Sequence, residues 1–366
     1  MSAKTAQPLR AAAGADAQPA GPSFLDILQR LAEGHDLTRA QAAAAMMQIV
    51  DGTAAEPQAA AFLMALRVKG EAPDEIAGLL EVMRRFAVPV DTPYQDGLID
   101  IVGTGGDCLG TFNISTTAAF VVAGAGARVA KHGNRAASSR CGSADVMEAL
   151  GVRIDLMPHE VAACLDKVGI AFMLASLHHP AMSKVAVVRR ALGIRTVFNF
   201  LGPLTNPAGV RRQLLGVSAP EYLAVLAGAL ARLGCEHALL VSGFGGMDEL
   251  SVTGPSMVIE VRGGVVGSPS EMQPEQYGLG THDQEALAGG DPADNAAITR
   301  SVLAGESGAR RDAVLLNAAA ALYVAGAVPS IVDGVTRAAE SIDSGRAAHV
   351  VDRLVAVTHT LVEARR

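Results

Sequence analysis

The sequence predicts an α/β protein with a small N-terminal helical domain and a large α/β domain around a mostly parallel central sheet. Three observations support this: residues 23–87 show only helical patterns, strands alternate with helices after Pro93, and the chain closes with helical stretches. Such alternation is typical of a parallel sheet that helices cover. The 366 residues suffice for two domains. We place the helical domain at 23–93 and the large domain at 94–366.

Cap and turn residues divide the first domain into four helices. Ser23 is placed to cap the first, and Thr38 with Gln41 forms a capping-box pattern for the second. Pro57 and Pro73 stand where prolines open the third and fourth helices. Glycines follow the ends of the first three helices: Gly34, Gly52 and Gly70.

Short apolar runs mark the strands of the second domain. They lie at 98–102, 128–131, 152–154, 170–174, 214–217, 238–241 and 258–261. Helical patterns occupy 116–125, 158–168 and 220–233 between them, and 310–325, 330–344 and 346–363 after them.

Composition excludes several classes of protein. The net charge of −7, with 4% aromatic residues and no Trp, is unfavourable for binding nucleic acid. No apolar stretch reaches the roughly 18 residues of a membrane span. The cysteines form no CxxC motif, which favours reduced thiols in a cytoplasmic protein: Cys108, Cys141, Cys164 and Cys235. Residues 1–22 lack a signal-like apolar region and are expected to be a disordered tail, with a weak transit peptide as the alternative.

The strongest candidate site begins directly after the first strand. Gly103-Thr-Gly-Gly-Asp107 leads to Thr111-Phe-Asn-Ile-Ser-Thr116 at a helix start. Glycines let backbone N–H groups approach a ligand, and a helix N-terminus attracts anions. The pattern is neither GxGxxG nor a P-loop, so it favours a different kind of phosphate site over a tight structural turn.

Two further stretches follow strands. Lys131-His-Gly-Asn-Arg135, continued by hydroxyls to Ser143, supplies cations and polar groups that suit phosphate and ribose. Asp248-Glu249 offers adjacent carboxylates, which suit Mg²⁺ together with substrate phosphates, although such a pair is often only solvated surface. In 178–207 the arginines could clamp a carboxylate or simply lie on a helix surface, and no third ligand completes a metal site with His178 and His179.

Taken in order, these stretches resemble the anthranilate phosphoribosyltransferase family. The resemblance includes GTGGD, TFNIST, KHGNR, HPAM, RTVFNFLGPLTNP and MDEL, and it runs from about Phe24 nearly to the C-terminus. It implies transfer of phosphoribose from phosphoribosyl pyrophosphate (PRPP) to anthranilate with Mg²⁺, in tryptophan biosynthesis. It also implies the nucleoside phosphorylase-like transferase fold, a return of residues near 180–211 to the helical domain, and a homodimer.

The resemblance also implies roles for particular residues. Ser115, Asp248 and Glu249 would hold a pair of Mg²⁺ ions, and Gly103, Asn134 and Arg189 would hold anthranilate. No general base is assigned, and His132 is a candidate only by its place in the sequence. PRPP would contact Gly103, Gly106, Asp107, Thr111, Asn113, Ile114, Ser115, Thr116, Lys131, His132, Gly133, Asn134, Arg135, Ala136, Ala137, Ser138, Ser139 and Ser143.

Two positions depart from the family pattern. Cys141 replaces a more usual Ser, and Phe244-Gly-Gly-Met247 precedes the acidic pair, so we expect altered loop detail with activity retained. A pyrimidine nucleoside phosphorylase is one alternative function, and a non-enzymatic nucleic-acid-binding relative is another. The KHGNR stretch, the Asp248-Glu249 pair and the FNFLGPLTNP stretch resemble the transferase more closely than the phosphorylase. The acidic composition and the intact carboxylate pair rank the nucleic-acid binder last.

Overall fold

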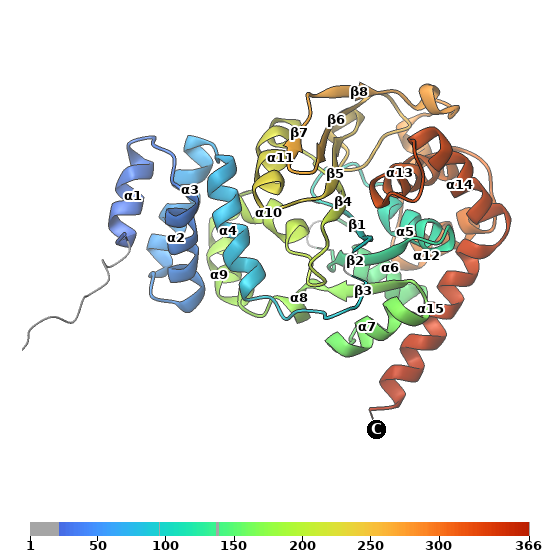
Figure 1. The fold of residues 1–366 in the computed structure, drawn as a ribbon, viewed down its shortest axis with the longest axis horizontal. Helices are drawn as coiled ribbons and strands as arrows, with labels where there is room; N and C mark the ends of the chain where they lie inside the picture. Colours follow the sequence, from blue (N-terminus) through green and yellow to red (C-terminus); the bar gives the residue numbers. More distant parts are fainter. Residues whose placement is uncertain (1–21, 95, 137–138, 366) are drawn as a thin grey trace, which may run out of the picture.

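Helices alone build the N-terminal part of the chain. The computed structural model describes residues 22–94, 96–136 and 139–365, so the tail expected at 1–22 lies almost wholly outside the described residues. The helices are α1 (Phe24–Ala32), α2 (Arg39–Asp51), α3 (Glu56–Lys69) and α4 (Pro73–Arg85) (Figure 1). The predicted caps are confirmed, because the hydroxyl oxygens of Ser23 and Thr38 accept the N–H groups of Asp26 and Gln41.

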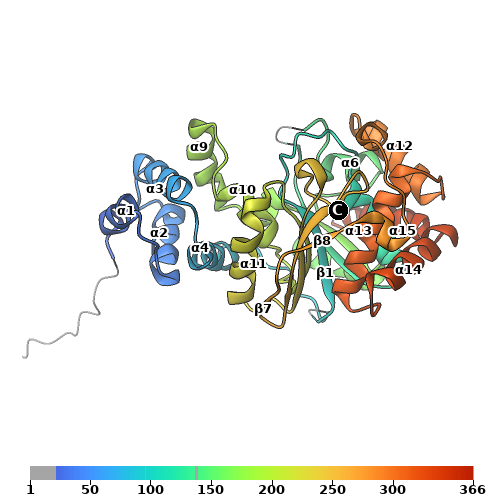
Figure 2. The ribbon, with the colours of Figure 1, turned by 90° about the horizontal axis from the view of Figure 1, so that it is seen from above.

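A later segment packs against these helices. It contains α8 (Ala175–His178), α9 (Met182–Leu192) and α10 (Phe198–Leu201). Helix α9 packs against α2 and α3, and α10 packs against α4. Figure 2 shows α9 on the side of the N-terminal helices, away from the sheet.

The sheet has the order β3-β2-β1-β4-β5-β6-β7, with β8 also paired to β6. The parallel strands are β1 (Leu98–Gly103), β2 (Arg128–Gly133), β3 (Ile170–Leu174), β4 (Arg212–Gly216) and β5 (His237–Ser242). The antiparallel strands are β6 (Ser256–Arg262), β7 (Val265–Val266) and β8 (Ser270–Met272). The predicted fold class, with its mostly parallel sheet, is therefore confirmed.

Strand register aligns the carboxyl ends of the parallel strands. Gly103 pairs with Gly216, and Gly216 pairs with Val241, so β1, β4 and β5 end at the same edge. Loops that follow parallel strands meet at this edge, where α/β proteins commonly bind their ligands. The glycine, lysine and acidic stretches all lie near it.

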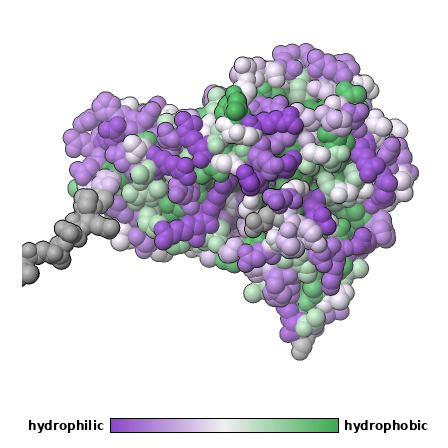
Figure 3. All heavy atoms as spheres, in the orientation of Figure 1, coloured by the Kyte–Doolittle hydropathy of each residue, from purple (hydrophilic) through white to green (hydrophobic). Residues whose placement is uncertain are grey.

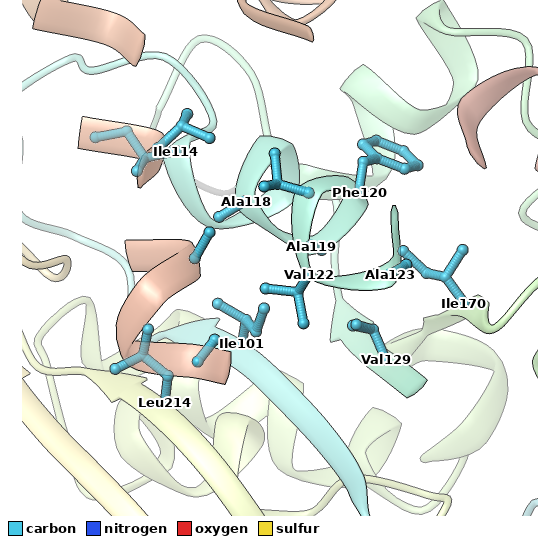
Figure 4. Packing of buried hydrophobic residues seen from close by; sticks show 14 of the residues in the cluster. Ile101, Ile114, Ala118, Ala119, Phe120, Val122, Ala123, Val129, Ile170 and Leu214 are labelled. Atoms are coloured by element: carbon cyan, nitrogen blue, oxygen red, sulfur yellow. The ribbon is translucent and has the colours of Figure 1, made fainter. Parts of the chain in front are cut away.

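Helices cover both faces of the sheet (Figure 1). One face contacts α5 (Ile114–Gly124) and α13 (Ala309–Ala325), and the other contacts α11 (Leu223–Arg232), which packs against α4. Figure 4 shows Val122 of α5 directed toward Ile101 and Val129 of the strands. The remaining helices are α6 (Ser143–Ala149), α7 (Pro158–Lys167), α12 (Pro292–Leu303), α14 (Ile331–Asp343) and α15 (Arg346–Glu363). Short 3₁₀ turns occur at Gly202–Leu204, Pro220–Tyr222, Phe244–Gly246, Pro274–Tyr277 and Gln284–Leu287.

The strand predicted at 152–154 is wrong. Val152 and Ile154 are buried, which produced the alternating pattern, but the segment pairs with no strand. Instead, the Arg153 N–H donates to the Thr358 hydroxyl of α15 at 3.2 Å. Among the described residues, no helix is long and apolar enough to cross a membrane.

Candidate active site

The glycine loop after β1 lies directly against the acidic pair. The Gly105 N–H donates to Asp248 Oδ2 at 2.6 Å. A Cβ atom at Gly103 would lie 2.1 Å from the same oxygen, so this approach requires glycine. Gly105 and Gly106 have φ angles of 72° and 75°, in the left-handed region that side chains disfavour. The glycines therefore serve both the loop conformation and the position of Asp248.

The start of α5 connects the other acidic residue to the lysine. The Ser115 N–H donates to Glu249 Oε1 at 3.0 Å. Lys131 is 1% exposed, and its Nζ donates to Ile101 O at 2.6 Å and lies 3.5 Å from Ser115 Oγ. Stretches separated by more than a hundred residues in sequence thus meet at one edge of the sheet.

Charge is concentrated and poorly solvated at this edge. Burial raises the pKa of Asp248, and the Asp107 carboxylate adds to the shift. Burial also raises the pKa of Glu249, reinforced by the charge of Asp248. Burial lowers the pKa of Lys131, although Asp100 and the acidic pair oppose this. Because the two carboxyl groups are hard to ionise at the same time, a bound cation would strongly stabilise their charged forms.

The donor set suits Mg²⁺ shared with a phosphate ligand. Among the described residues, no group of three or more His, Cys, Asp or Glu side chains could hold a metal ion without help. Mg²⁺ is commonly bound by one or two carboxylates, with waters and substrate phosphates completing its shell. Asp248, Glu249 and the Ser115 hydroxyl provide hard oxygen ligands of this kind.

Residues of the TFNIST stretch divide between core and site. Ile114 and Thr116 are each 1% exposed, so their side chains face the core and their backbone groups are what a ligand can meet. Asn113 Oδ1 accepts a hydrogen bond from Asn295 Nδ2 at 2.9 Å. Thr111 forms an isolated bridge with Ala288, which joins the loop to the segment before α12.

The loop after β2 is held by α6. Ser143 Oγ accepts the Asn134 N–H at 3.2 Å, and a Cβ atom at Gly133 would lie 2.2 Å from that oxygen. Arg135 binds Glu148 of α6 through two hydrogen bonds of 2.5 and 2.9 Å. Its guanidinium group is therefore occupied at the protein surface. Ala136 is held through its N–H by Asp145 Oδ2 at 2.9 Å, while Ser139 is exposed and Ala137 and Ser138 lie outside the described residues.

His132 is buried at the end of β2. Its backbone N–H donates to Asp100 Oδ1 at 3.1 Å, and its ring centroid lies 5.2 Å from that of His179. Burial, with a smaller contribution from His179, lowers the pKa of His132 to about 3. The imidazole is therefore neutral at physiological pH.

Arg189 is placed on α9 rather than at the strand edge. Its guanidinium carbon lies 5.9 Å from the centroid of the Phe198 ring. Within the described residues, no hydrogen bond joins it to Gly103 or Asn134. Among the described residues, the predicted anthranilate residues are therefore not linked to one another by hydrogen bonds through Arg189.

Two supporting residues were not assigned a role from the sequence. Arg195 donates to the carbonyl oxygens of Gly105 and Gly106 at 2.8 and 3.1 Å. Asn317 of α13 holds both backbone groups of Leu250, the residue after Glu249, at 3.0 and 2.9 Å. Arg195 begins the RTVFNFLGPLTNP stretch that carried the family resemblance, and the partners of both residues are distant in sequence.

The chain matches both parts of one protein family. Residues 25–87 match the helical bundle domain of the glycosyl transferase family, and residues 95–348 match its a/b domain. An anthranilate phosphoribosyltransferase of Rubrobacter xylanophilus is 52% identical over 337 residues, covering 92% of this chain and 98% of the relative. One from Anaeromyxobacter sp. strain K is 55% identical over 333 residues, covering 90% and 97%.

Solved structures agree with these matches. Anthranilate phosphoribosyltransferase from Thermus thermophilus has a TM-score of 0.86 and 45% identity, covering 91% of this chain and 99% of that one. The Saccharomyces cerevisiae enzyme in complex with PRPP and Mg has a TM-score of 0.83 and 29% identity, covering 92% and 98%. The yeast enzyme in complex with 4-fluoroanthranilate has a TM-score of 0.82 and 28% identity, with the same coverage.

The helical bundle, the α/β domain and the site at the strand ends define a glycosyl transferase. Within that class, the chain belongs to the anthranilate phosphoribosyltransferase family. The resemblance found in the sequence is confirmed. These relatives support the transferase prediction over the nucleoside phosphorylase and nucleic-acid-binding alternatives.

Proposed function

We propose that this protein transfers the 5-phosphoribosyl group from PRPP to the amine of anthranilate. The products are N-(5-phosphoribosyl)anthranilate and pyrophosphate, and the reaction belongs to tryptophan biosynthesis. The observation that carries the proposal is the meeting of the glycine loop, the α5 start and the acidic pair through the Gly105–Asp248 and Ser115–Glu249 hydrogen bonds. The relatives named above support the choice of substrates.

PRPP is proposed to lie along the carboxyl ends of β1 and β2. Backbone N–H groups of the glycine loop and of the α5 start would bind pyrophosphate, because a glycine-rich turn and a helix N-terminus both favour an anion. The phosphoribosyl group would lie along the loop after β2. The proposed contacts are Gly103, Gly106, Asp107, Thr111, Asn113, Ile114, Ser115, Thr116, Lys131, His132, Gly133, Asn134, Arg135, Ala136, Ala137, Ser138, Ser139 and Ser143.

We assign a pair of Mg²⁺ ions to Ser115, Asp248 and Glu249. Bound Mg²⁺ would supply neutralisation of charge on the pyrophosphate group. The chain's own part is to hold each carboxylate in place, Asp248 through the Gly105 N–H and Glu249 through the Ser115 N–H. The raised pKa values of both carboxyl groups reflect how unfavourable that arrangement is without a cation.

The chemistry requires no protein nucleophile. Cleavage of the anomeric C–O bond develops positive charge on the ribose and negative charge on the leaving pyrophosphate. Preorganised N–H groups of the glycine loop would stabilise that negative charge. Gly103, Asn134 and Arg189 would hold anthranilate so that its amine faces the anomeric carbon, which supplies rate by positioning. Burial lowers the pKa of His132 to about 3, which makes its imidazole a poor proton acceptor, and no general base is assigned.

The same reasoning extends to organisation and location. We propose a helical domain of residues 23–93 with a return segment near 180–211, and a large domain of 94–366. We further propose a homodimer joined through the helical domains, where Leu25 and Val68 are 67% and 80% exposed. Figure 3 shows apolar residues among polar ones on the surface of these helices. A cytoplasmic location is supported by the unpaired cysteines, all of which are free thiols.

The proposal is tested by following anthranilate fluorescence with PRPP and Mg²⁺. The parent should consume anthranilate, and the Asp248→Asn/Glu249→Gln double variant should not. A matched control removes two exposed carboxylates on α15, Asp352→Asn/Glu363→Gln, and should behave as the parent. A folded parent that consumes no anthranilate would refute the proposed function.

A further inference from the structure

One arginine contacts the glycine loop from a different part of the fold. Arg195 lies between α9 and α10, in the segment whose helices pack against the N-terminal helices. Its Nη2 donates to Gly105 O at 2.8 Å, and its Nη1 donates to Gly106 O at 3.1 Å. Two successive carbonyl oxygens of the loop are therefore bound by one planar guanidinium group.

Ser218, which follows β4, strengthens this contact. Arg195 Nη2 donates to Ser218 Oγ at 2.9 Å, and Ser218 Oγ donates to Gly105 O at 3.0 Å. On the other side of the same residue, the Gly105 N–H binds Asp248 Oδ2. The Gly105 backbone is thus held at both its carbonyl oxygen and its N–H group.

Fixing these carbonyl groups also fixes the N–H groups that share their peptide planes. In a trans peptide the C=O and N–H bonds point in opposite directions. The Gly105 carbonyl shares a peptide with the Gly106 N–H, and the Gly106 carbonyl shares one with the Asp107 N–H. Both N–H groups therefore point away from Arg195, and neither has a hydrogen-bond partner among the described residues. They are available to an anion.

We propose that Arg195 is a positioning residue that holds the Gly106 and Asp107 N–H groups toward the pyrophosphate of the substrate. This inference rests on the proposed function, and it adds to it a residue that acts through the loop without touching the substrate. The binding energy of the phosphate cradle then depends on a side chain from the segment that packs on the helical domain.

The geometry of this contact also limits which side chain could replace Arg195. A Cβ atom at Gly106 would lie 3.1 Å from the guanidinium group, so the guanidinium group packs tightly against the Gly106 backbone. A lysine has a single nitrogen without the planar fork of arginine, and it cannot bind both carbonyl oxygens and Ser218 in this arrangement. Charge alone should therefore not replace Arg195.

The test compares Arg195→Gln and Arg195→Lys with Arg190→Gln, an exposed arginine at the end of α9. Hydrogen bonds to charged groups are strong enough that losing two should raise the KM for PRPP about 10- to 100-fold. In Arg195→Gln the KM for anthranilate and the melting temperature should stay near the parent values. Arg195→Lys should recover only a small part of the lost PRPP affinity. Arg190→Gln should match the parent in all three quantities.

Several results would overturn the inference. An unchanged KM for PRPP in Arg195→Gln would do so, and so would full recovery in Arg195→Lys, which would indicate a role of charge. Equal losses for both substrates with a lower melting temperature would indicate a general structural role.

Calorimetric binding of magnesium pyrophosphate separates this inference from the proposed function. A parent without transferase activity refutes the function, whereas equal pyrophosphate affinity in the parent and Arg195→Gln refutes the role of Arg195. A Ser218→Ala variant in the same series should weaken pyrophosphate binding less than Arg195→Gln. The effect of Ser218→Ala should be smaller still when Arg195 is already replaced, because Arg195 also binds the Ser218 hydroxyl and orients it toward Gly105 O.

Discussion

Replacing Asn317 with alanine should weaken the anchoring of the backbone that carries Asp248 and Glu249. Asn317 is fully buried on α13, and its side-chain amide accepts the Leu250 N–H and donates to the Leu250 carbonyl. Leu250 is itself fully buried and directly follows Glu249, and its backbone has no other hydrogen-bond partner among the described residues. Asn317→Ala therefore leaves a buried donor and a buried acceptor unpaired.

The expected loss follows from these two groups. Each unpaired buried group costs about 1–3 kcal/mol, so the free energy of unfolding should fall by roughly 2–6 kcal/mol. Because the Glu249 backbone is no longer anchored, the Mg²⁺ concentration for half-maximal activity should rise by about tenfold. Urea denaturation followed by circular dichroism measures the first quantity, and a Mg²⁺ titration of the initial rate measures the second.

A second buried truncation serves as the control. Ser341 of α14 is fully buried and donates to Val121 O at 2.8 Å, away from the strand-end site. Ser341→Ala should lower stability by about 1 kcal/mol and leave the Mg²⁺ titration unchanged. If Asn317→Ala kept the parent's Mg²⁺ requirement while losing stability, the claim that Asn317 positions the acidic pair would be refuted.

Three further outcomes are expected. Gly103→Ala should lower kcat/KM by more than about 100-fold with Mg²⁺ present, since its Cβ would lie 2.1 Å from Asp248 Oδ2; near-parent kinetics would contradict this. In EDTA, the parent should lose roughly 2–5 °C of melting temperature as pH rises from about 4 to 8, because the unfolded state releases the protons of Asp248 and Glu249 first. The Asp248→Asn/Glu249→Gln variant should not show this fall in melting temperature. Equal slopes of melting temperature against pH in the parent and the variant would contradict the prediction. Asn295→Ala should raise the KM for PRPP several-fold by freeing the Asn113 amide, which substrate-dependence kinetics would detect.

Local signals predicted the elements well. Ser23 and Thr38 cap their helices as expected, because a cap depends on residues three positions away. The run at 98–102 was recognisable as a strand because β1 is buried on both faces, as parallel strands usually are. Residues 152–154 were also predicted to be a strand, because buried Val152 and Ile154 alternate with Arg153. The Arg153 N–H instead donates to Thr358 of α15, and periodicity does not distinguish such a segment from a paired strand.

The site was predictable only in part, for a related reason. The glycine loop, Lys131 and the acidic pair each follow a strand, so their meeting could be anticipated from a parallel sheet. The contribution of Asn317 could not, because its partner Leu250 lies 67 residues away in the sequence. Arg195 likewise acts on glycines about 90 residues earlier. Nothing in the local sequence indicates which arginine reaches the loop.

The most direct test of the central claim is the stoichiometry of the reaction products. Purified protein, anthranilate, PRPP and Mg²⁺ should yield one pyrophosphate for each N-linked phosphoribosyl anthranilate, identified by mass spectrometry. Chelation of Mg²⁺, or the Asp248→Asn/Glu249→Gln substitutions, should abolish both products together. Pyrophosphate release without the N-linked product, or neither product from the folded parent, would contradict the account.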